Sequence, residues 1–336
     1  MRTKPSNPIL ESDQAEGLRR LLVRGLPQVI TVLSGRAGMG RTCTISNLAA
    51  AISRCGKRVL VLDENRLASY FQVREGSRAR YDLLDIALEK CKLSDALFTQ
   101  NGYALLSTKR ALSSLAQMRH IEKLRIESVL AELNSSVDVM LIDAAVPSLI
   151  NPLAMRLGYQ KSIVSALVMS QAEGLLRKID KFNDAISCHS LLLVVDGTSS
   201  GITDSYVMMK RLAQDNANLK FEIVINKVSD EQVALKIFAN MEKVASLNVA
   251  AQLVYLGCIP VDEKLKKASQ LGLSAFDIHP AASSAKSYTL LCKKIIWFDA
   301  KPPQDAIAAS SLIKNLMRHI SQPLQKSNQH IAQLTH

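Results

Sequence analysis

A glycine-rich loop between a strand pattern and a helix pattern constrains this sequence most. Residues 34–42 read Ser-Gly-Arg-Ala-Gly-Met-Gly-Arg-Thr, after an apolar run at residues 29–33 and before apolar residues at helical spacing. Small residues let a backbone curl until several N–H groups point at one anion, and a helix N-terminus adds a favourable dipole. Residues 34–42, here called the phosphate loop, are therefore predicted to bind phosphate between a strand and a helix.

The phosphate loop supplies most of the residues predicted to hold a nucleotide. Backbone N–H groups would contact the phosphate oxygens, and the Thr42 hydroxyl stands where it would ligate Mg²⁺. These predicted nucleotide-binding residues are Gly35, Arg36, Ala37, Gly38, Met39, Gly40, Arg41, Thr42 and Cys43. Judged by the loop alone, a glycine-containing turn with no ligand is the alternative.

Two acidic residues end apolar strand patterns further along the chain. Asp63 ends the run at residues 57–63, and Asp143 ends the run at residues 138–143, which resembles a Walker B strand. In open α/β sheets, ligands bind at the carboxyl ends of the strands. Asp63 and Asp143 are therefore predicted catalytic and magnesium-binding carboxylates, with Thr42 as the third metal ligand.

Short apolar runs alternate with helical patterns along most of the chain. They fall at residues 29–33, 59–62, 103–106, 137–142, 191–195, 221–225 and 253–256. This rhythm predicts an α/β fold of three layers, with a mainly parallel sheet and helices on both faces. The predicted core domain covers residues 28–300 with a possible insertion at residues 149–188, for which no function is suggested, between tails at residues 1–27 and 301–336.

Composition limits the class of protein and the sign of its partners. With 48% hydrophobic residues, a chain of 336 residues can bury a sizeable core. Its six cysteines form no CxxC pair and no segment is typical of a signal or membrane-spanning helix, so we expect reduced thiols in a cytoplasmic protein. The formal charge of +12 leaves nucleic acid, anionic lipid and acidic proteins open as partners, while 4% aromatic residues argue against a single-strand binder.

The order of phosphate loop, Asp63 and Asp143 resembles the MinD/ParA family of P-loop NTPases. That family has lysines at the positions of Arg36 and Arg41, and the resemblance implies that Arg36 is a third catalytic residue. Arginine keeps the charge but presents a planar fork, so the exchange is not neutral. The family also has a second aspartate two residues after the first, where this chain has Asn65 or a register shifted by one residue. It has an Asp-x-x-Ala-Gly run where this chain reads Asp-Ala-Ala-Val from Asp143. These departures leave both ATP hydrolysis and a catalytically impaired adaptor open.

Four further segments resemble the flagellar branch of that family, the FlhG, FleN and YlxH proteins. They lie at residues 81–85, 201–206, 224–228 and 255–262. The resemblance implies ATP and Mg²⁺ as cofactors, an ATP-dependent homodimer, and contacts to adenine from Asn226 and from the loop at Pro260 and Asp262. It also implies regulation of flagellar number and placement, through a flagellar transcription activator or motor switch proteins. A ParA-like DNA-partitioning role is less favoured.

The N-terminal segment at residues 13–19 carries the feature specific to that branch. It reads Asp-Gln-Ala-Glu-Gly-Leu-Arg and is similar to the DQAxxLR helix of FlhG proteins. The resemblance implies that Asp13, Gln14, Leu18 and Arg19 contact an FlhF-type GTPase and stimulate its GTP hydrolysis. An amphipathic helix packed on its own core is the alternative.

The C-terminal tail contains a basic amphipathic pattern. Its apolar side comprises Leu312, Ile313, Leu316, Met317 and Ile320. Such a helix can lie in a membrane interface, and the resemblance implies peripheral contact with the inner membrane. Equally, the same apolar side could pack on the core of the domain.

Overall fold

The computed structural model describes residues 27–65, 81–114, 117–144, 189–215, 219–249 and 251–296. The predicted partner motif at residues 13–19, the possible insertion at residues 149–188 and the apolar stripe at residues 312–320 lie outside the described residues. Their predictions therefore stay predictions.

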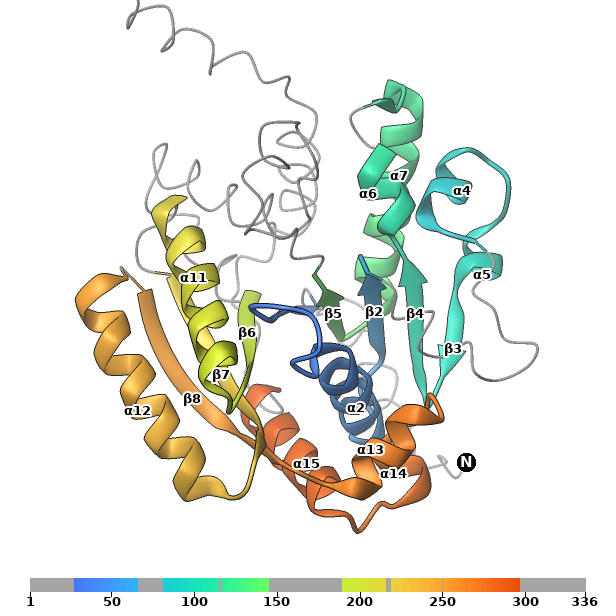
Figure 1. The fold of residues 1–336 in the computed structure, drawn as a ribbon. Coiled ribbons are helices and arrows are strands. Elements are labelled where there is room, and N and C mark those ends of the chain that lie inside the picture. Colours follow the sequence, from blue (N-terminus) through green and yellow to red (C-terminus); the bar gives the residue numbers. More distant parts are fainter. Residues whose placement is uncertain are drawn as a thin grey trace, which may run out of the picture.

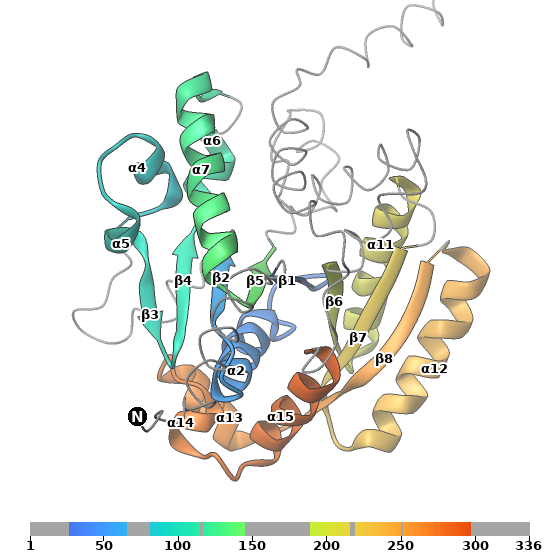
Figure 2. The same cartoon turned by 180° about the vertical axis from the view of Figure 1, so that it is seen from behind.

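An eight-stranded sheet forms the centre of the molecule, in the order β3-β4-β2-β5-β1-β6-β7-β8. Figure 2 shows the strands in this order from left to right. The strands are β1 (Gln28–Leu33), β2 (Val59–Asp63), β3 (Phe98–Gln100), β4 (Tyr103–Ser107), β5 (Val139–Asp143), β6 (His189–Asp196), β7 (Leu219–Val228) and β8 (Ala251–Pro260). All neighbours pair in parallel except β3 and β4. The predicted mainly parallel sheet is confirmed.

One face of the sheet is covered by α2 and by three helices near the end of the described chain (Figure 1). These helices are α2 (Arg41–Arg54), α13 (Glu263–Gln270), α14 (Ala275–Ile278) and α15 (Ser283–Ile295). The apolar residues that recur at helical spacing in α2, namely Ile45, Leu48, Ala49 and Ile52, are all 0% exposed. The helix that follows the phosphate loop is thus firmly packed on this face of the sheet.

The opposite face carries two groups of helices. The first covers β2, β4 and β5, and the second covers β6, β7 and β8. The first group is α4 (Leu83–Ala87), α5 (Leu93–Ala96), α6 (Lys109–Ser114) and α7 (His120–Ser136), and the second is α11 (Ser199–Asp215) and α12 (Glu231–Asn248). In β2, Val61 packs on the α2 face while Leu60 and Leu62 pack on the other, which explains why parallel strands read as continuous apolar runs. The three layers are confirmed.

The described part of the chain contains no helix with both the length and the apolar character needed to cross a bilayer.

Candidate functional site

The phosphate loop joins the end of β1 to the start of α2, and its shape depends on glycine at two positions. Gly38 and Gly40 have φ of 84° and 93°, in the left-handed region that residues with a Cβ rarely adopt. A Cβ on Gly40 would also lie 2.2 Å from Asn226 Nδ2. At Gly40 the loop therefore lies too close to Asn226 for any larger residue. Its backbone leads directly into the N-terminus of α2.

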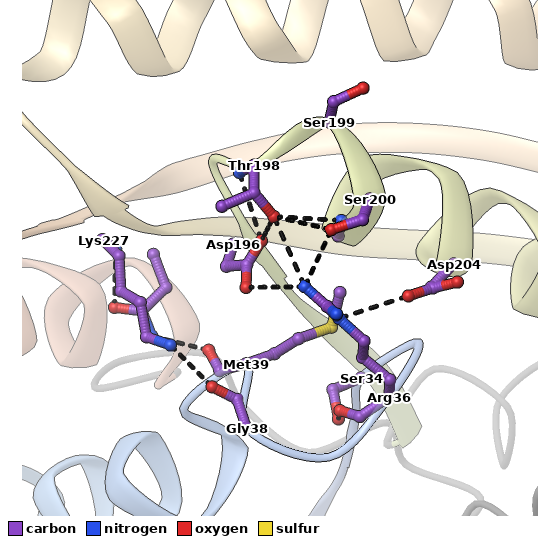
Figure 3. Close-up of polar contacts among 12 residues, drawn as sticks. Ser34, Arg36, Gly38, Met39, Asp196, Thr198, Ser199, Ser200, Asp204 and Lys227 are labelled. Carbon is purple, nitrogen blue, oxygen red and sulfur yellow. Dashed lines mark hydrogen bonds and ion pairs between the residues drawn. The ribbon is translucent and has the colours of Figure 1, made fainter.

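Residues at the end of β7 hold the phosphate loop from the side. Asn226, which is 5% exposed, donates from Nδ2 to the Met39 carbonyl oxygen over 2.8 Å. Lys227 donates from Nζ to the Gly38 carbonyl oxygen over 2.6 Å, with its own backbone at a φ of 59° (Figure 3). The predicted contact of Asn226 with adenine stays a prediction, and the structure shows its amide nitrogen bonded to the loop. Lys227 was not predicted, although its place directly after Asn226 was a signal.

Arg36 extends from the loop to the end of β6 and the start of α11 (Figure 3). Its Nε lies 3.2 Å from Asp204 Oδ2, and its Nη2 lies 3.7 Å from Asp196 Oδ2 and 3.0 Å from Ser200 Oγ. The side chain is 42% exposed, so these ion pairs are partly screened by solvent. Arg36 therefore has two carboxylate partners in its own chain, and neither of them is Asp63 or Asp143.

Arg41 instead contacts the predicted Walker B carboxylate. Its Nε lies 2.7 Å from Asp143 Oδ1, and its Nη1 makes a long 3.5 Å hydrogen bond to Ser34 Oγ. Asp143 is 0% exposed and the Arg41 side chain is 15% exposed. A buried carboxylate needs a compensating partner, and Arg41 provides it from the first residue of α2.

Asp63 and Asp143 lie side by side, as the sequence predicted. They are register partners at the ends of β2 and β5. Asn65 connects them, because its Nδ2 donates to Asp143 Oδ1 over 2.9 Å while its backbone N–H donates to Asp63 Oδ1 over 2.9 Å. The Asn65 side chain and backbone thus supply hydrogen-bond donors between the two carboxylates.

The buried carboxylate of Asp143 is easier to protonate than an ordinary aspartate. Burial raises its pKa to about 6, with a smaller upward effect from the charge of Asp63. Arg41 and the hydrogen bond from Asn65 act in the opposite direction and do not cancel the effect of burial.

The groups around Asp143 leave only one of its two carboxylate oxygens open to a ligand such as Mg²⁺. A magnesium ligand must be an oxygen with a free lone pair, whereas Asp143 Oδ1 already faces a guanidinium and an amide N–H. Asp143 Oδ2 is buried and has no hydrogen-bond partner among the described residues. The Thr42 hydroxyl, half-buried in the first turn of α2, makes no hydrogen bond to the residues that the structure describes. No group of three or more His, Cys, Asp or Glu side chains in these ranges is placed to hold a metal ion.

The predicted adenine-side residues lie at the end of β8. Pro260 is the last residue of that strand and pairs with Val228 of β7, next to Asn226. Asp262 caps the N-terminus of α13, accepting a hydrogen bond from the Lys264 backbone N–H over 2.9 Å. It also accepts bonds from Ser283 Oγ at 3.0 Å and from Ser284 Oγ at 2.7 Å. The burial of Asp262 raises its pKa, but these hydrogen bonds outweigh that effect and lower it to about 2. Its carboxylate therefore joins α13 to α15.

The remaining predicted residues differ in exposure. Ala37 is exposed at the crest of the loop, while Met39 is 0% exposed. Cys43, in α2, accepts a hydrogen bond at its carbonyl oxygen from Asn47 Nδ2 over 2.9 Å. Gly35 lies where a Cβ would come 2.4 Å from the Ser205 backbone nitrogen, so α11 packs directly on the loop. The structure thus brings the loop, β2, β5, β7 and α11 to one edge of the sheet.

Comparisons with known proteins agree with this architecture. The family model of the CobQ/CobB/MinD/ParA nucleotide binding domain matches residues 30–275. Antiactivator FleN of Pseudomonas aeruginosa is 24% identical over 269 residues, which cover 80% of this chain and 86% of FleN. Septum site-determining protein MinD of Helicobacter pylori is 24% identical over 274 residues, covering 80% and 90% of the two chains.

Solved structures show the same fold. MinD cell division protein of Aquifex aeolicus superposes with a TM-score of 0.52 at 19% identity, covering 80% of this chain and 96% of that one. A ParA family ATPase of Chlorobium tepidum gives a TM-score of 0.52 at 17% identity, covering 80% and 98%. Because the family model spans well over half of the chain, and the phosphate loop, Asp63 and Asp143 meet at one sheet edge, the chain belongs to the CobQ/CobB/MinD/ParA nucleotide-binding domain family.

Proposed function

We propose that this protein is an ATP-binding regulator of flagellar number and placement. The observation that carries the nucleotide part is the phosphate loop, with Gly38 and Gly40 in left-handed conformations at the N-terminus of α2. Backbone N–H groups in that arrangement attract phosphate. The flagellar part is supported by the similarity to FleN over 80% of the chain, and by the resemblance of residues 13–19 to the FlhG motif.

Flagellar counts in the source bacterium test this function as a whole. Deleting the gene is expected to change flagellar number or position in electron micrographs, and the wild-type gene is expected to restore the normal pattern. A Gly40→Ala gene, which disrupts the loop, is expected not to restore it. An unchanged flagellar pattern after deletion would contradict the proposal.

The proposed first partner is an FlhF-type GTPase, contacted by residues 13–19. Helical spacing places Gln14 and Leu18 on one side of the helix, which suits a polar probe beside an apolar anchor. Gln14→Ala is expected to abolish stimulation of the GTPase by the purified protein. Asn7→Ala, outside the motif, is the matched control and is expected to stimulate like wild type. Equal stimulation by Gln14→Ala and wild type would rule out this role.

A second proposed interaction is ATP-dependent dimerisation with peripheral contact to the inner membrane. Residues 312–320 would supply the contact, because apolar side chains next to basic ones favour an anionic lipid surface. Flotation with anionic vesicles is expected to recover wild-type protein in the presence of ATP. Leu316→Glu is expected to prevent this, whereas Asn315→Glu adds the same charge on the polar side and is expected to have little effect. Vesicle binding that survives Leu316→Glu would favour packing of the stripe on the domain core.

A catalytically impaired ATPase that works as an adaptor is the second candidate, and the Arg41 to Asp143 ion pair favours it. With Asn65 bonded to the same oxygen, Asp143 Oδ1 is occupied, and the guanidinium charge lies beside the carboxylate that would position water. In this role the chain would present its surfaces to the GTPase and to a flagellar transcription activator, which the name of the FleN relative supports, or to motor switch proteins. Phosphate release indistinguishable from an Asp143→Ala variant would favour the adaptor, and release clearly above it would favour an ATPase.

A further inference from the structure

Arg41 and Asp143 lie at the place where P-loop nucleotide sites hold their divalent cation. In such sites the ion is bound by the hydroxyl of the loop Ser or Thr and by the Walker B aspartate. Here Thr42 and Asp143 occupy those two positions, and Arg41 Nε lies 2.7 Å from Asp143 Oδ1. The guanidinium of Arg41 thus already places a positive charge beside Asp143, the carboxylate that a magnesium site would need.

We infer that Arg41 acts as a built-in counter-ion in place of the divalent cation, so that this site binds its nucleotide without Mg²⁺. The inference rests on the proposed nucleotide binding and specifies the form of the ligand, a metal-free nucleoside triphosphate. It differs from the magnesium dependence that the family resemblance implies.

The ion pair is well placed to persist. Asp143 is 0% exposed and Arg41 15% exposed, so solvent screens their attraction poorly. Arg41 is also the first residue of α2, whose following turns are buried, so its backbone is fixed relative to β5. A metal ion entering beside Asp143 would face the guanidinium charge at short range in a buried site.

Asn65 adds to the mismatch with a metal ion. Its Nδ2 donates to Asp143 Oδ1 and to the Asp143 carbonyl oxygen, over 2.9 and 3.0 Å. An aspartate at this position would offer another oxygen ligand, whereas the amide places N–H groups against the carboxylate. Arg41 and Asn65 thus both act on the same oxygen, Arg41 through the charge of its guanidinium 2.7 Å away and Asn65 through a hydrogen bond.

Positive charge for the phosphates is available without a metal. Arg41 and Lys227 both contact the phosphate loop, Lys227 through its 2.6 Å bond to the Gly38 carbonyl oxygen and Arg41 through Ser34. The backbone N–H groups at the start of α2 add the dipole of the helix. With the charge of Arg41 paired to Asp143, Lys227 and the helix dipole supply the positive potential that the phosphates meet.

The test is the ATP affinity of the purified full-length chain in excess Mg²⁺ and in EDTA, at equal ionic strength. Wild type is expected to give dissociation constants that agree within about twofold. Arg41→Lys keeps one positive charge but replaces the guanidinium fork with a flexible ammonium that holds Asp143 less firmly. In that variant Mg²⁺ is expected to tighten ATP binding by about tenfold or more.

Arg58→Lys is the matched control. Arg58 pairs with Asp138 over 2.7 Å, and the two residues directly precede β2 and β5, at the end of these strands that lies away from the phosphate loop. It is expected to behave like wild type. Wild-type affinity that falls about tenfold or more in EDTA would overturn the inference while leaving nucleotide binding intact. No ATP binding under either condition would overturn the proposed function itself. The wild-type comparison decides the question even if Arg41→Lys does not fold.

Discussion

Asn226 donates a hydrogen bond from Nδ2 to the Met39 carbonyl oxygen over 2.8 Å, and this bond joins the end of β7 to the phosphate loop. The two residues are 187 positions apart in the chain. Between β7 and the loop's own strand β1 lies β6. The shape of the phosphate loop is therefore maintained by a strand that is not its neighbour in the sheet.

Asn226→Ala is expected to lower both stability and ATP affinity. The substitution leaves the Met39 carbonyl oxygen without this partner in a buried setting, which costs about 2 kcal/mol in the free energy of unfolding. Urea denaturation and ATP titration measure the two effects. Asn240→Ala removes the same side chain at an exposed position of α12 and is expected to change neither. Unaltered ATP binding in Asn226→Ala would show that the loop does not depend on this bond.

Comparing Gly40→Ala with Gly56→Ala separates two effects on stability, a steric clash of the new Cβ and the cost of a positive φ. Both glycines have positive φ, 93° and 79°, so alanine costs about 1 kcal/mol at either position. A Cβ at Gly40 would also lie 2.2 Å from Asn226 Nδ2, whereas a Cβ at Gly56 would meet nothing within 4 Å. Thermal unfolding is expected to show the larger loss in Gly40→Ala, and only that variant is expected to lose ATP binding. Equal losses in the two variants would contradict the tight packing of the loop.

The raised pKa of Asp143 predicts a pH dependence of stability. Its pKa is about 6 in the folded chain against an ordinary 3.8, so between these values the folded chain binds more protons than the unfolded one. The free energy of unfolding must therefore fall as pH rises through this window, by an amount on the order of 3 kcal/mol for this group. Subtracting the curve of Asp143→Asn removes the background from other acids. A difference curve that is flat, or that rises with pH, would contradict the burial of an ionisable Asp143.

The thiols of Cys55 and Cys292 test how α2 packs on α15. Their Sγ atoms lie 3.7 Å apart, Cys55 directly after α2 and Cys292 within α15. Mild oxidation with diamide is expected to join them in a disulfide that non-reducing mass spectrometry detects. Cys91, half-buried near α4, is an internal control that is expected to stay unlinked. Failure of the two thiols to couple would indicate that α15 is packed differently.

Much of the fold could be predicted because parallel strands buried on both faces leave a strong signal. All seven predicted strands are present. Several are longer than predicted, because their backbone hydrogen bonds to neighbouring strands continue past the most apolar residues. The eighth strand, β3, was missed because it has three residues and pairs only at an edge, antiparallel to β4. So short an element is specified by its turn at Asn101 and Gly102, both at positive φ, rather than by apolar periodicity.

The candidate site was only partly predictable. The neighbouring positions of Asp63 and Asp143 follow from strand ends that meet at one edge of a parallel sheet. The partners of the two arginines do not follow from the sequence, since Arg36 faces Asp196 and Asp204 while Arg41 faces Asp143. A long side chain can reach several carboxylates at such an edge, and only the packed structure selects among them.

The most direct test of the central claim is calorimetric titration of ATP into the purified full-length protein, in the presence and absence of Mg²⁺. A nucleotide site at the phosphate loop predicts saturable binding by wild type and by Gly56→Ala, and its loss in Gly40→Ala. Absence of ATP binding by wild type under both conditions, or equal binding by the two glycine variants, would contradict the account.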